Sequence, residues 1–428
     1  MINTTSDKVS LQIPVIRFIA LTGVLALVIV HFFPTLPIPI STVSLFTPMI
    51  IFICALILNK PFILDRWTSE IYVFLLLWLC YAIVGLLWTI NYAVTIDYIW
   101  KILIYTLTFI VFSQLFRNRK YLCLAPLIFQ LVIYVYCVIY VWEILTGNHL
   151  PGSRLYGISL PLPTGFYYNE NNSAVFVLLL SPYLRVKTHL TSSMIGKVVA
   201  LLVFLLLTAV AVIQNSRLAM VLMLMLGIYF FFRSGWLIRA LAVVTIIIGF
   251  VSFVVFFPTE YKALQYVMKY QIKLTKAETG SYAMTSSSIR NQLNRESINL
   301  LSLSKFLGVS GGNYEVYLNK ARYHKTSWVI NPHNWWLEIL ANFGLLVALG
   351  MVFIYLRWLY RLFRQRQCFN NKGYSLNESS LISLLMFIPL SIIPSSIRHY
   401  YSVWAYFAFI HSVCLLPLPK EHIIANQG

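Results

Sequence analysis

Three arginines and one histidine stand where the sequence could support chemistry on a phosphate. Arg154 lies in HLPGSRLYG, Arg217 begins an apolar run in NSRLAM, and Arg290 lies in SSSIRNQL. His333 precedes another apolar run. A guanidinium can bind a phosphate through two parallel hydrogen bonds, and a neutral imidazole can accept a proton at pH 7. These residue types predict a site that binds phosphate oxygens, with interfacial anchoring of each arginine as the structural alternative.

The residues around His333 predict a neutral ring. Asn331 is expected to cap a helix, with Pro332 in the first helical position and His333 just inside. A helix N-terminus and nearby arginines both disfavour imidazolium. Asn334 and Glu338, four residues apart, would lie on one helical face and help to orient the ring or a sugar, although capping and helix pairing explain them as well. We expect His333 to act as a base, and a hydrogen-bonded surface histidine is the alternative.

Aromatic and amide side chains gather in GFYYNENNSA, where Tyr168 precedes three asparagines. Flat rings beside amides suit a sugar, whereas the rings alone are also typical of the aromatic belt at a membrane interface. We predict that Tyr168 and Asn172, together with Asn334 and Arg154, bind substrate.

Acidic residues are too sparse to predict a metal site. The sequence has three aspartates and no Asp-x-Asp, and Asp97 is expected to pair with Lys101 four residues later. Divalent ions prefer hard oxygen ligands, so arginine would have to stabilise charge in place of magnesium. No cofactor is expected.

One motif match is rejected. Residues 308–312 fit G-x-S-x-G, but a hydrolase nucleophile elbow needs a strand, a turn and a helix in an α/β sheet. The segment before it has helical spacing, with Ser286 to Ser288 as capping residues and Gly308 as the end of the helix. The glycines at 308–312 are therefore interpreted as a flexible turn.

Composition determines which elements must position these residues. Hydrophobic residues make up 59% of the chain and charged residues 11%, with a mean hydropathy of +0.78. This excludes an ordinary soluble globule and predicts an all-α, multi-pass membrane protein. The net charge of +19 does not indicate nucleic acid, because most Lys and Arg lie between apolar runs and report topology.

The apolar runs predict about twelve membrane helices in one integral domain covering residues 1–428. The run at 172–186 is short, which leaves ten or eleven spans open, and the first run is expected to be a retained helix and not a cleaved signal peptide. The predicted spans are 14–33, 38–58, 71–90, 98–116, 121–145, 172–186, 197–214, 217–232, 239–257, 335–358, 379–395 and 401–418.

Charge placement orients the bundle. With both termini in the cytoplasm, inner loops hold eighteen of the 32 basic residues and short outer connections hold four. The other ten lie with four acids in a loop of 75 residues, 258–332, which is expected to face the periplasm or the cell exterior. Such a loop suits an anionic partner, and contact with lipid headgroups is the alternative for its lysines. None of the six cysteines lies in an outer loop, so a disulfide framework is not expected.

Four motifs in order resemble the O-antigen ligase and O-antigen polymerase superfamily, which includes capsule and teichuronic acid polymerases. They are GFYYNENNSA, NSRLAM, SSSIRNQL running into FLGVSGGNY, and PHNWWLEILANFG, and they cover residues 164–346. The resemblance implies a GT-C-like membrane glycosyltransferase that uses a polyprenyl-pyrophosphate glycan without a metal. It implies catalytic roles for Arg217, Arg290 and His333, whereas Arg154 and Asn172 match the motifs less closely.

The resemblance implies a polysaccharide polymerase in a bacterial inner or plasma membrane, with its site on the periplasmic or extracellular side. The glycan would pass from the carrier to a sugar hydroxyl on another carrier-linked unit, with inversion. An O-antigen ligase acting on lipid A core and a protein glycosylase remain alternatives, and PHNWWLEILANFG favours the polymerase. Expected partners are the donor, the glycan acceptor, membrane lipid and a chain-length regulator protein.

A transporter or flippase is the rival from another class, and a glycan-binding scaffold is a third reading. The sequence shows no inverted repeat and no ionisable pair in the middle of a span, and this disfavours transport.

Overall fold

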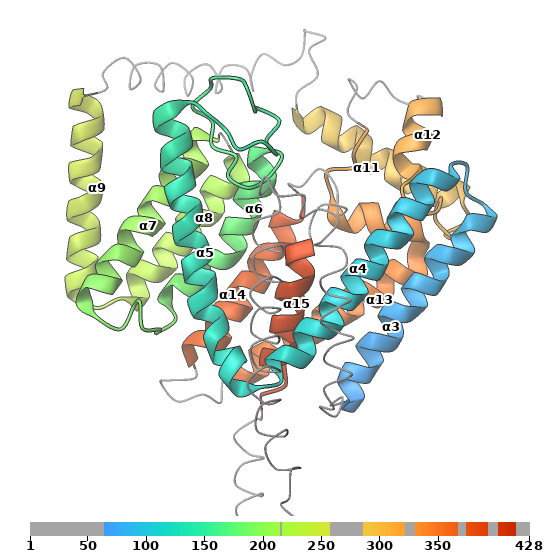
Figure 1. Ribbon diagram of the computed structural model, residues 1–428, viewed down its shortest axis with the longest axis horizontal. Coiled ribbons are helices and arrows are strands. Elements are labelled where there is room, and N and C mark those ends of the chain that lie inside the picture. The colour runs from blue at the N-terminus through green and yellow to red at the C-terminus, as the bar shows by residue number, and fades with distance from the viewer. Residues whose placement is uncertain are drawn as a thin grey trace, which may run out of the picture.

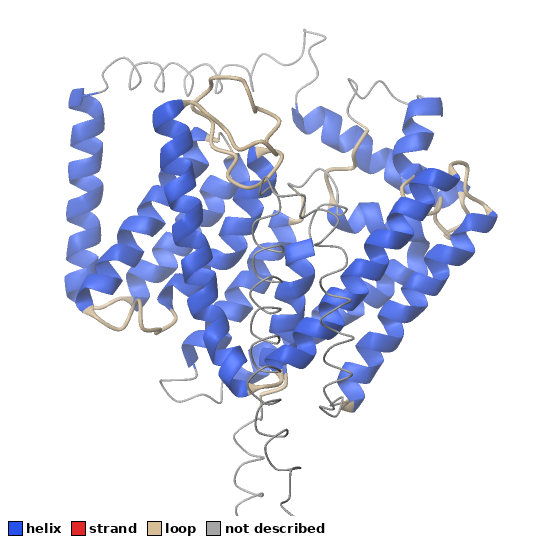
Figure 2. Ribbon diagram, viewed as in Figure 1, coloured by secondary structure: helices blue, strands red, loops and turns tan. Residues whose placement is uncertain are grey.

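The computed structural model describes residues 64–214, 216–256, 286–321, 330–366, 374–392 and 401–416. Within these ranges the chain is all-helical, and no strand occurs there (Figure 2). The predicted spans at 14–33 and 38–58 lie outside the described residues. The described helices are α3 (Arg66–Val84), η1 (Gly85–Leu87), α4 (Tyr92–Phe116), α5 (Arg119–Thr146), α6 (Glu170–Leu180), η2 (Ser181–Arg185), α7 (Met194–Ile213), α8 (Arg217–Arg233), α9 (Trp236–Phe256), α11 (Ser286–Leu303), α12 (Asn313–Ala321), α13 (Trp335–Arg366), α14 (Tyr374–Leu390) and α15 (Tyr401–Cys414).

Five of the described helical segments are long and apolar enough to cross a membrane. They are 66–87, 92–116, 119–146, 194–213 and 335–365. The predicted span at 172–186 is wrong as a single helix, because α6 has only 11 residues and continues as the 3₁₀-helix η2. Pro182 lies at the start of η2, and its ring and missing N–H disfavour a continued α-helix.

The helices form a bundle with two distinct ends (Figure 1). One end carries the connection 147–169 and the helices α11 and α12, and we call it the α11 end. The start of α3 and the turn between α4 and α5 lie at the opposite end, which we call the Asp65 end. The predicted pair of Asp97 and Lys101 is confirmed as an ion pair.

The core is rich in aromatic rings, which lock α13 to its neighbours. Trp404 of α15 stacks on Tyr105 of α4 at 5.3 Å between ring centroids. Trp335, the first residue of α13, packs against Phe387 of α14 at 5.4 Å and donates its backbone N–H to Ser391 O at 2.8 Å. The start of α13 is therefore held firmly against α14.

Helix α13 is broken at Gly344, where φ is +76° and ψ is −178°. The segment after α11 fills the break, because Val309 N–H donates to Ala341 O and Leu345 N–H donates to Phe306 O. A Cβ on Gly308 would lie 2.4 Å from Gly344 N, so only glycine permits this approach of two backbones. The span expected at 335–358 falls within the candidate membrane span 335–365, but the helix is kinked at Gly344 by this docking. The flexible turn expected at 308–312 is wrong, because this segment is packed against α13.

The same segment is held from the side of α3 and α4. Trp88 Nε1 donates to Gly308 O at 3.0 Å, and Tyr81 Oη donates to Leu307 O at 2.7 Å. Asn313 Nδ2 donates to the hydroxyls of Thr89 and Thr95, each at 2.8 Å. Helix α11 ends at Leu303 and not at Gly308, since residues 304–312 form an irregular connection in which the backbone N–H groups of residues 304–309 are hydrogen-bonded.

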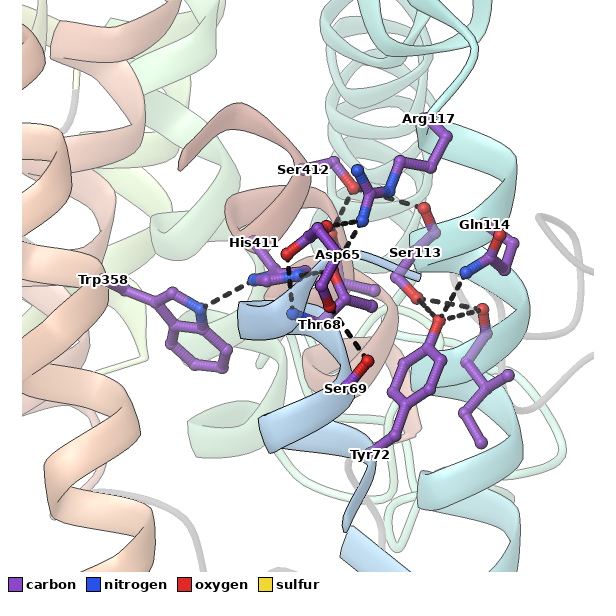
Figure 3. A network of polar contacts seen from close by, with 12 residues as sticks. Asp65, Thr68, Ser69, Tyr72, Ser113, Gln114, Arg117, Trp358, His411 and Ser412 are labelled. Carbon is purple, nitrogen blue, oxygen red and sulfur yellow. Dashed lines mark hydrogen bonds and ion pairs between the residues drawn. The ribbon is translucent and has the colours of Figure 1, made fainter. Parts of the chain in front are cut away.

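At the Asp65 end a polar network ties four helices together (Figure 3). Asp65 caps α3 by accepting from Thr68 N–H at 2.9 Å, and Arg117 donates to both Asp65 and the Thr68 hydroxyl. Thr68 Oγ1 also lies 2.9 Å from His411 Nε2, and Trp358 Nε1 donates to the other ring nitrogen of His411 at 3.4 Å. Helices α3, α4, α13 and α15 are thus joined by one hydrogen-bond network.

Candidate functional site

The candidate residues lie on elements that meet at the α11 end. Tyr167 Oη of the connection 147–169 lies 3.0 Å from Ser402 Oγ at the start of α15. Gln214 Nε2, just before α8, donates to Pro163 O of the same connection at 2.8 Å. The starts of α8 and α15 are therefore both bonded to this connection.

His333 lies immediately before α13. The helix is capped by Asn334, whose Oδ1 accepts from Trp336 N–H at 3.1 Å and Leu337 N–H at 3.2 Å. The predicted cap at Asn331 is wrong, because His333 has a φ of +49°, a left-handed conformation that cannot begin a helix. The His333 side chain is half-buried, with Nδ1 enclosed by protein. The ring stands at the helix N-terminus, on a turn and not inside the first helical turn.

The cap defines what Asn334 can offer to a ligand. Its Oδ1 is committed to the helix, so a sugar could use only its amide N–H groups. Glu338 is 1% exposed and accepts from Tyr98 Oη at 3.0 Å, which points this carboxylate toward α4. Substrate binding by Asn334 stays a prediction.

Arg217 is the first residue of α8 and is exposed. Within the described part of the chain its guanidinium has no hydrogen bond or ion pair with another residue. The free N–H groups of the first helical turn lie next to it, and these favour an anion.

Arg290 lies in the second turn of α11 and is half-buried. Burial lowers the pKa of its guanidinium from the ordinary value. A guanidinium is in practice always charged in proteins, so Arg290 remains a cation. No other residue of the described ranges forms an ion pair or hydrogen bond with Arg290, so its charge is partly desolvated and lacks a described counter-charge.

Arg154 is different because it has a partner. Its Nη2 donates to Glu170 Oε1 at 2.7 Å and its Nε donates to Glu170 Oε2 at 3.2 Å. Its backbone N–H donates to Tyr168 O at 2.8 Å, and the Tyr168 side chain is 63% exposed. A phosphate would have to displace or share Glu170, whereas the Tyr168 ring is open to a ligand.

Asn172 is 2% exposed and lies in the first turn of α6. Its backbone N–H donates to Asn169 Oδ1 at 2.8 Å. Its own Oδ1 is buried and has no hydrogen-bond partner in the described ranges. A buried amide oxygen without a partner is costly, so this residue keeps an unused acceptor where a ligand hydroxyl could donate.

Glu143 is a residue whose role the sequence did not reveal. It is fully buried at the end of α5 and accepts from the backbone N–H groups of Thr164 and Gly165 at 2.9 and 2.8 Å. Its Oε1 lies 3.0 Å from His149 Nδ1. The sequence did contain one signal for this role, since an acid near the end of an apolar run needs hydrogen-bond or ion-pair partners. Glu143 fixes the fold of the connection 147–169.

The three predicted catalytic residues are thus carried by elements at one end of the bundle. Direct contact among Arg217, Arg290 and His333 stays a prediction, since neither arginine has a hydrogen bond or ion pair with another described residue. The described ranges contain no group of three or more His, Cys, Asp or Glu that could hold a metal ion.

Comparison with known proteins bears on this arrangement. The O-antigen ligase family matches the chain over residues 200–352, which includes Arg217, Arg290 and His333. The resemblance to the O-antigen ligase and polymerase superfamily is confirmed. The chain is also 25% identical over 361 residues to the teichuronic acid biosynthesis protein TuaE of Bacillus subtilis (strain 168), across 81% of this chain and 72% of that protein. The family match begins at residue 200, so Arg154, Tyr168 and Asn172 lie outside it.

Proposed function

We propose that this protein is a membrane glycosyltransferase that polymerises surface-polysaccharide repeat units. It would take a glycan from a polyprenyl-pyrophosphate carrier and transfer it to a sugar hydroxyl on another carrier-linked unit. The proposal includes a GT-C-like bundle of about twelve spans in a bacterial inner or plasma membrane, with the α11 end facing the periplasm or exterior.

One observation carries the proposal. Inside the matched range, Arg217 and Arg290 are cations with no acidic partner in the described part of the chain, and both lie on elements of the α11 end. Arginine binds a diphosphate well because its planar fork matches two oxygens at once. Two such cations suit a diphosphate leaving group.

The chemistry follows from these residue types. The acceptor oxygen forms a bond to the anomeric carbon from the face opposite the diphosphate, and the bond between that carbon and the diphosphate oxygen breaks. The electron pair leaves with the polyprenyl diphosphate, whose growing charge Arg217 and Arg290 stabilise. The hydroxyl proton passes to the imidazole of His333. Inversion at the anomeric carbon is expected, and no metal is required.

Polymerase activity is favoured over ligase activity by the relative that the chain resembles. TuaE is named for teichuronic acid biosynthesis, and the chain would act on a similar class of substrate. An O-antigen ligase that delivers the glycan to lipid A core is the alternative. Glycan analysis of a deletion strain separates them, because single repeats on the carrier indicate a lost polymerase, whereas long carrier-linked chains indicate a lost ligase.

The direct test uses the purified full chain in detergent with a carrier-linked oligosaccharide and a chelator. Longer carrier-linked glycans and released polyprenyl diphosphate are expected. His333→Ala should reduce the rate by about 10² to 10⁴, the range for loss of a general base. Unchanged covalent linkage in the glycan would instead identify a transporter or scaffold, and full activity of His333→Ala would remove that residue from the role of base.

Orientation has its own test. Tyr156 lies in the connection 147–169 and is 60% exposed. Tyr156→Cys in a background without other cysteines should react with a membrane-impermeant maleimide added to intact spheroplasts or protoplasts. Protection in intact cells combined with labelling after lysis would reverse the proposed orientation.

A further inference from the structure

A second feature, far from the candidate site, is a cavity of about 810 Å³ between α7, α8 and α9. Its inner surface is apolar, with Phe204, Met223, Ala242 and Ile246 among the lining residues. It opens beside the turns that join η2 to α7 and α8 to α9. Helix α9 stands at the edge of the described bundle (Figure 1).

The mouth of the cavity is basic. Five of the lining residues are Lys or Arg and none is acidic; they are Arg185, Lys187, Lys197, Arg233 and Arg239. These basic side chains gather from three separate segments of the chain. An apolar interior with one cationic rim matches a lipid that carries a negative headgroup.

Contacts in the rim hold two of the arginines without neutralising them. Arg185 Nη2 donates to Arg233 O at 3.2 Å, and Arg239 donates to Ser234 O and Phe232 O, each at 2.9 Å. Carbonyl oxygens orient a guanidinium but leave its charge in place.

The other three basic residues of the rim are two lysines and one arginine, and only the arginine has a described carboxylate partner. Lys187 and Lys197 are exposed and have no ion pair with a described residue. Arg233 alone pairs with a carboxylate, that of Glu378 at 3.3 Å. Within the described ranges, four of the five rim charges thus have no carboxylate partner and can attract a phosphate.

We infer that this cavity binds an anionic glycerophospholipid from the leaflet at the Asp65 end. An acyl chain fills the apolar interior between α8 and α9, and the headgroup phosphate lies against Lys187, Lys197 and Arg239. A zwitterionic lipid also carries a positive group, which the basic rim repels, so it is expected to bind more weakly than an anionic lipid. The glycan carrier of the proposed reaction is not this ligand, because the candidate catalytic residues lie on elements of the opposite end.

Native mass spectrometry of the full chain tests the inference. The wild-type protein, in detergent with equal amounts of phosphatidylglycerol and phosphatidylcholine, should retain phosphatidylglycerol preferentially. Lys187→Gln combined with Lys197→Gln should weaken that retention by roughly tenfold or more. Each basic residue near an anionic lipid surface is expected to raise the affinity by a factor of roughly five to ten. The matched control is Arg119→Gln combined with Lys120→Gln, which removes the same charge from exposed positions outside the cavity and should leave retention unchanged.

A variant without charge change tests the interior. Ala242→Trp places an indole ring in the cavity and narrows it, so it should reduce retention of both lipids, with unchanged elution of the protein in size-exclusion chromatography. Equal retention of the two lipids by the wild type, or an equal loss in the control pair, would overturn the inference. So would binding of polyprenyl phosphate at the cavity in place of the phospholipid. His333→Ala should keep full lipid retention, so failure of the proposed glycosyl transfer and failure of this inference are distinguishable.

Discussion

Two half-buried arginines at opposite ends of the bundle show different solutions to the same electrostatic problem. Arg117 at the Asp65 end donates to Asp65 and to the Thr68 hydroxyl in a closed network (Figure 3). Arg290 at the α11 end has no ion pair with another described residue, although burial lowers the pKa of both guanidinium groups. The first cation is neutralised by the fold, whereas the second has no counter-charge among the described residues and is available to an anionic ligand.

The difference has an energetic meaning. A cation removed from water loses hydration, and a buried charge without a partner destabilises the folded protein. Arg117 recovers this loss through Asp65, so its contribution should appear in stability. Arg290 would recover it only when an anion binds, so its contribution should appear in activity. A structural arginine is then distinguished from a functional one by whether it has an acidic partner in the fold.

Within the comparison of the two arginines, the largest expected effect is the loss of transfer in Arg290→Ala. Loss of one stabilising group for a developing negative charge typically lowers the rate by about 10² to 10³. Arg217→Ala should act similarly, because Arg217 is also unpaired in the described ranges. Initial rates with a carrier-linked oligosaccharide measure both.

Thermal unfolding in detergent is the control for these two variants. Arg290→Ala should leave the unfolding temperature unchanged or raise it, since no described contact is lost. A clear fall in unfolding temperature with a normal rate would mean that Arg290 is structural, and the contrast with Arg117 would disappear.

Arg117→Ala should have the opposite profile. It leaves Asp65 and Thr68 without their cationic donor, and loss of a hydrogen bond to a charged group costs about 1.5 to 3 kcal/mol. Both side chains of the ion pair are partly exposed, so the lower part of that range is expected. The unfolding temperature should fall, and the rate per folded molecule should change by less than about twofold.

Asp65→Asn is the matched variant for this pair. It keeps a cap for α3 but removes the negative charge, so it should lower stability by less than Arg117→Ala does. A rate loss comparable with that of Arg290→Ala in either variant would contradict the structural assignment of the Asp65 end.

The sequence predicted the parts of this fold that depend on local hydrophobicity. Helices α7 and α8 begin and end within three residues of the predicted spans 197–214 and 217–232. In the hydrocarbon core of a membrane, each backbone N–H and C=O must be hydrogen-bonded within the protein. A long apolar run is therefore strong evidence for a helix, and no partner from elsewhere in the chain is needed.

What the sequence could not predict depends on contacts between distant segments. The break at Gly344 exists because residues 306–309 donate to and accept from its two sides, and this docking requires glycine at 308 as well. The cap at Asn334 displaced the expected cap at Asn331 because His333 takes a left-handed conformation. In the candidate site, the placement of Arg217 at the start of a helix and of Arg290 near the start of another was predictable, but their lack of partners among the described residues and the pairing of Arg154 with Glu170 were not.

Arg154 offers the smallest and most discriminating test, because it lies at the α11 end yet is paired. If location alone makes an arginine functional, Arg154→Gln should reduce transfer as strongly as Arg290→Ala. If pairing decides, the rate should fall by only a few fold, since Glu170 already takes both donor groups. The partly exposed ion pair should contribute less than about 1 kcal/mol to stability.

Glu170→Gln sharpens the result, because it releases Arg154 without removing it. A rate equal to or above the wild type in Glu170→Gln, together with a small loss in Arg154→Gln, would place Arg154 with Arg117 among the cations that the fold uses for itself.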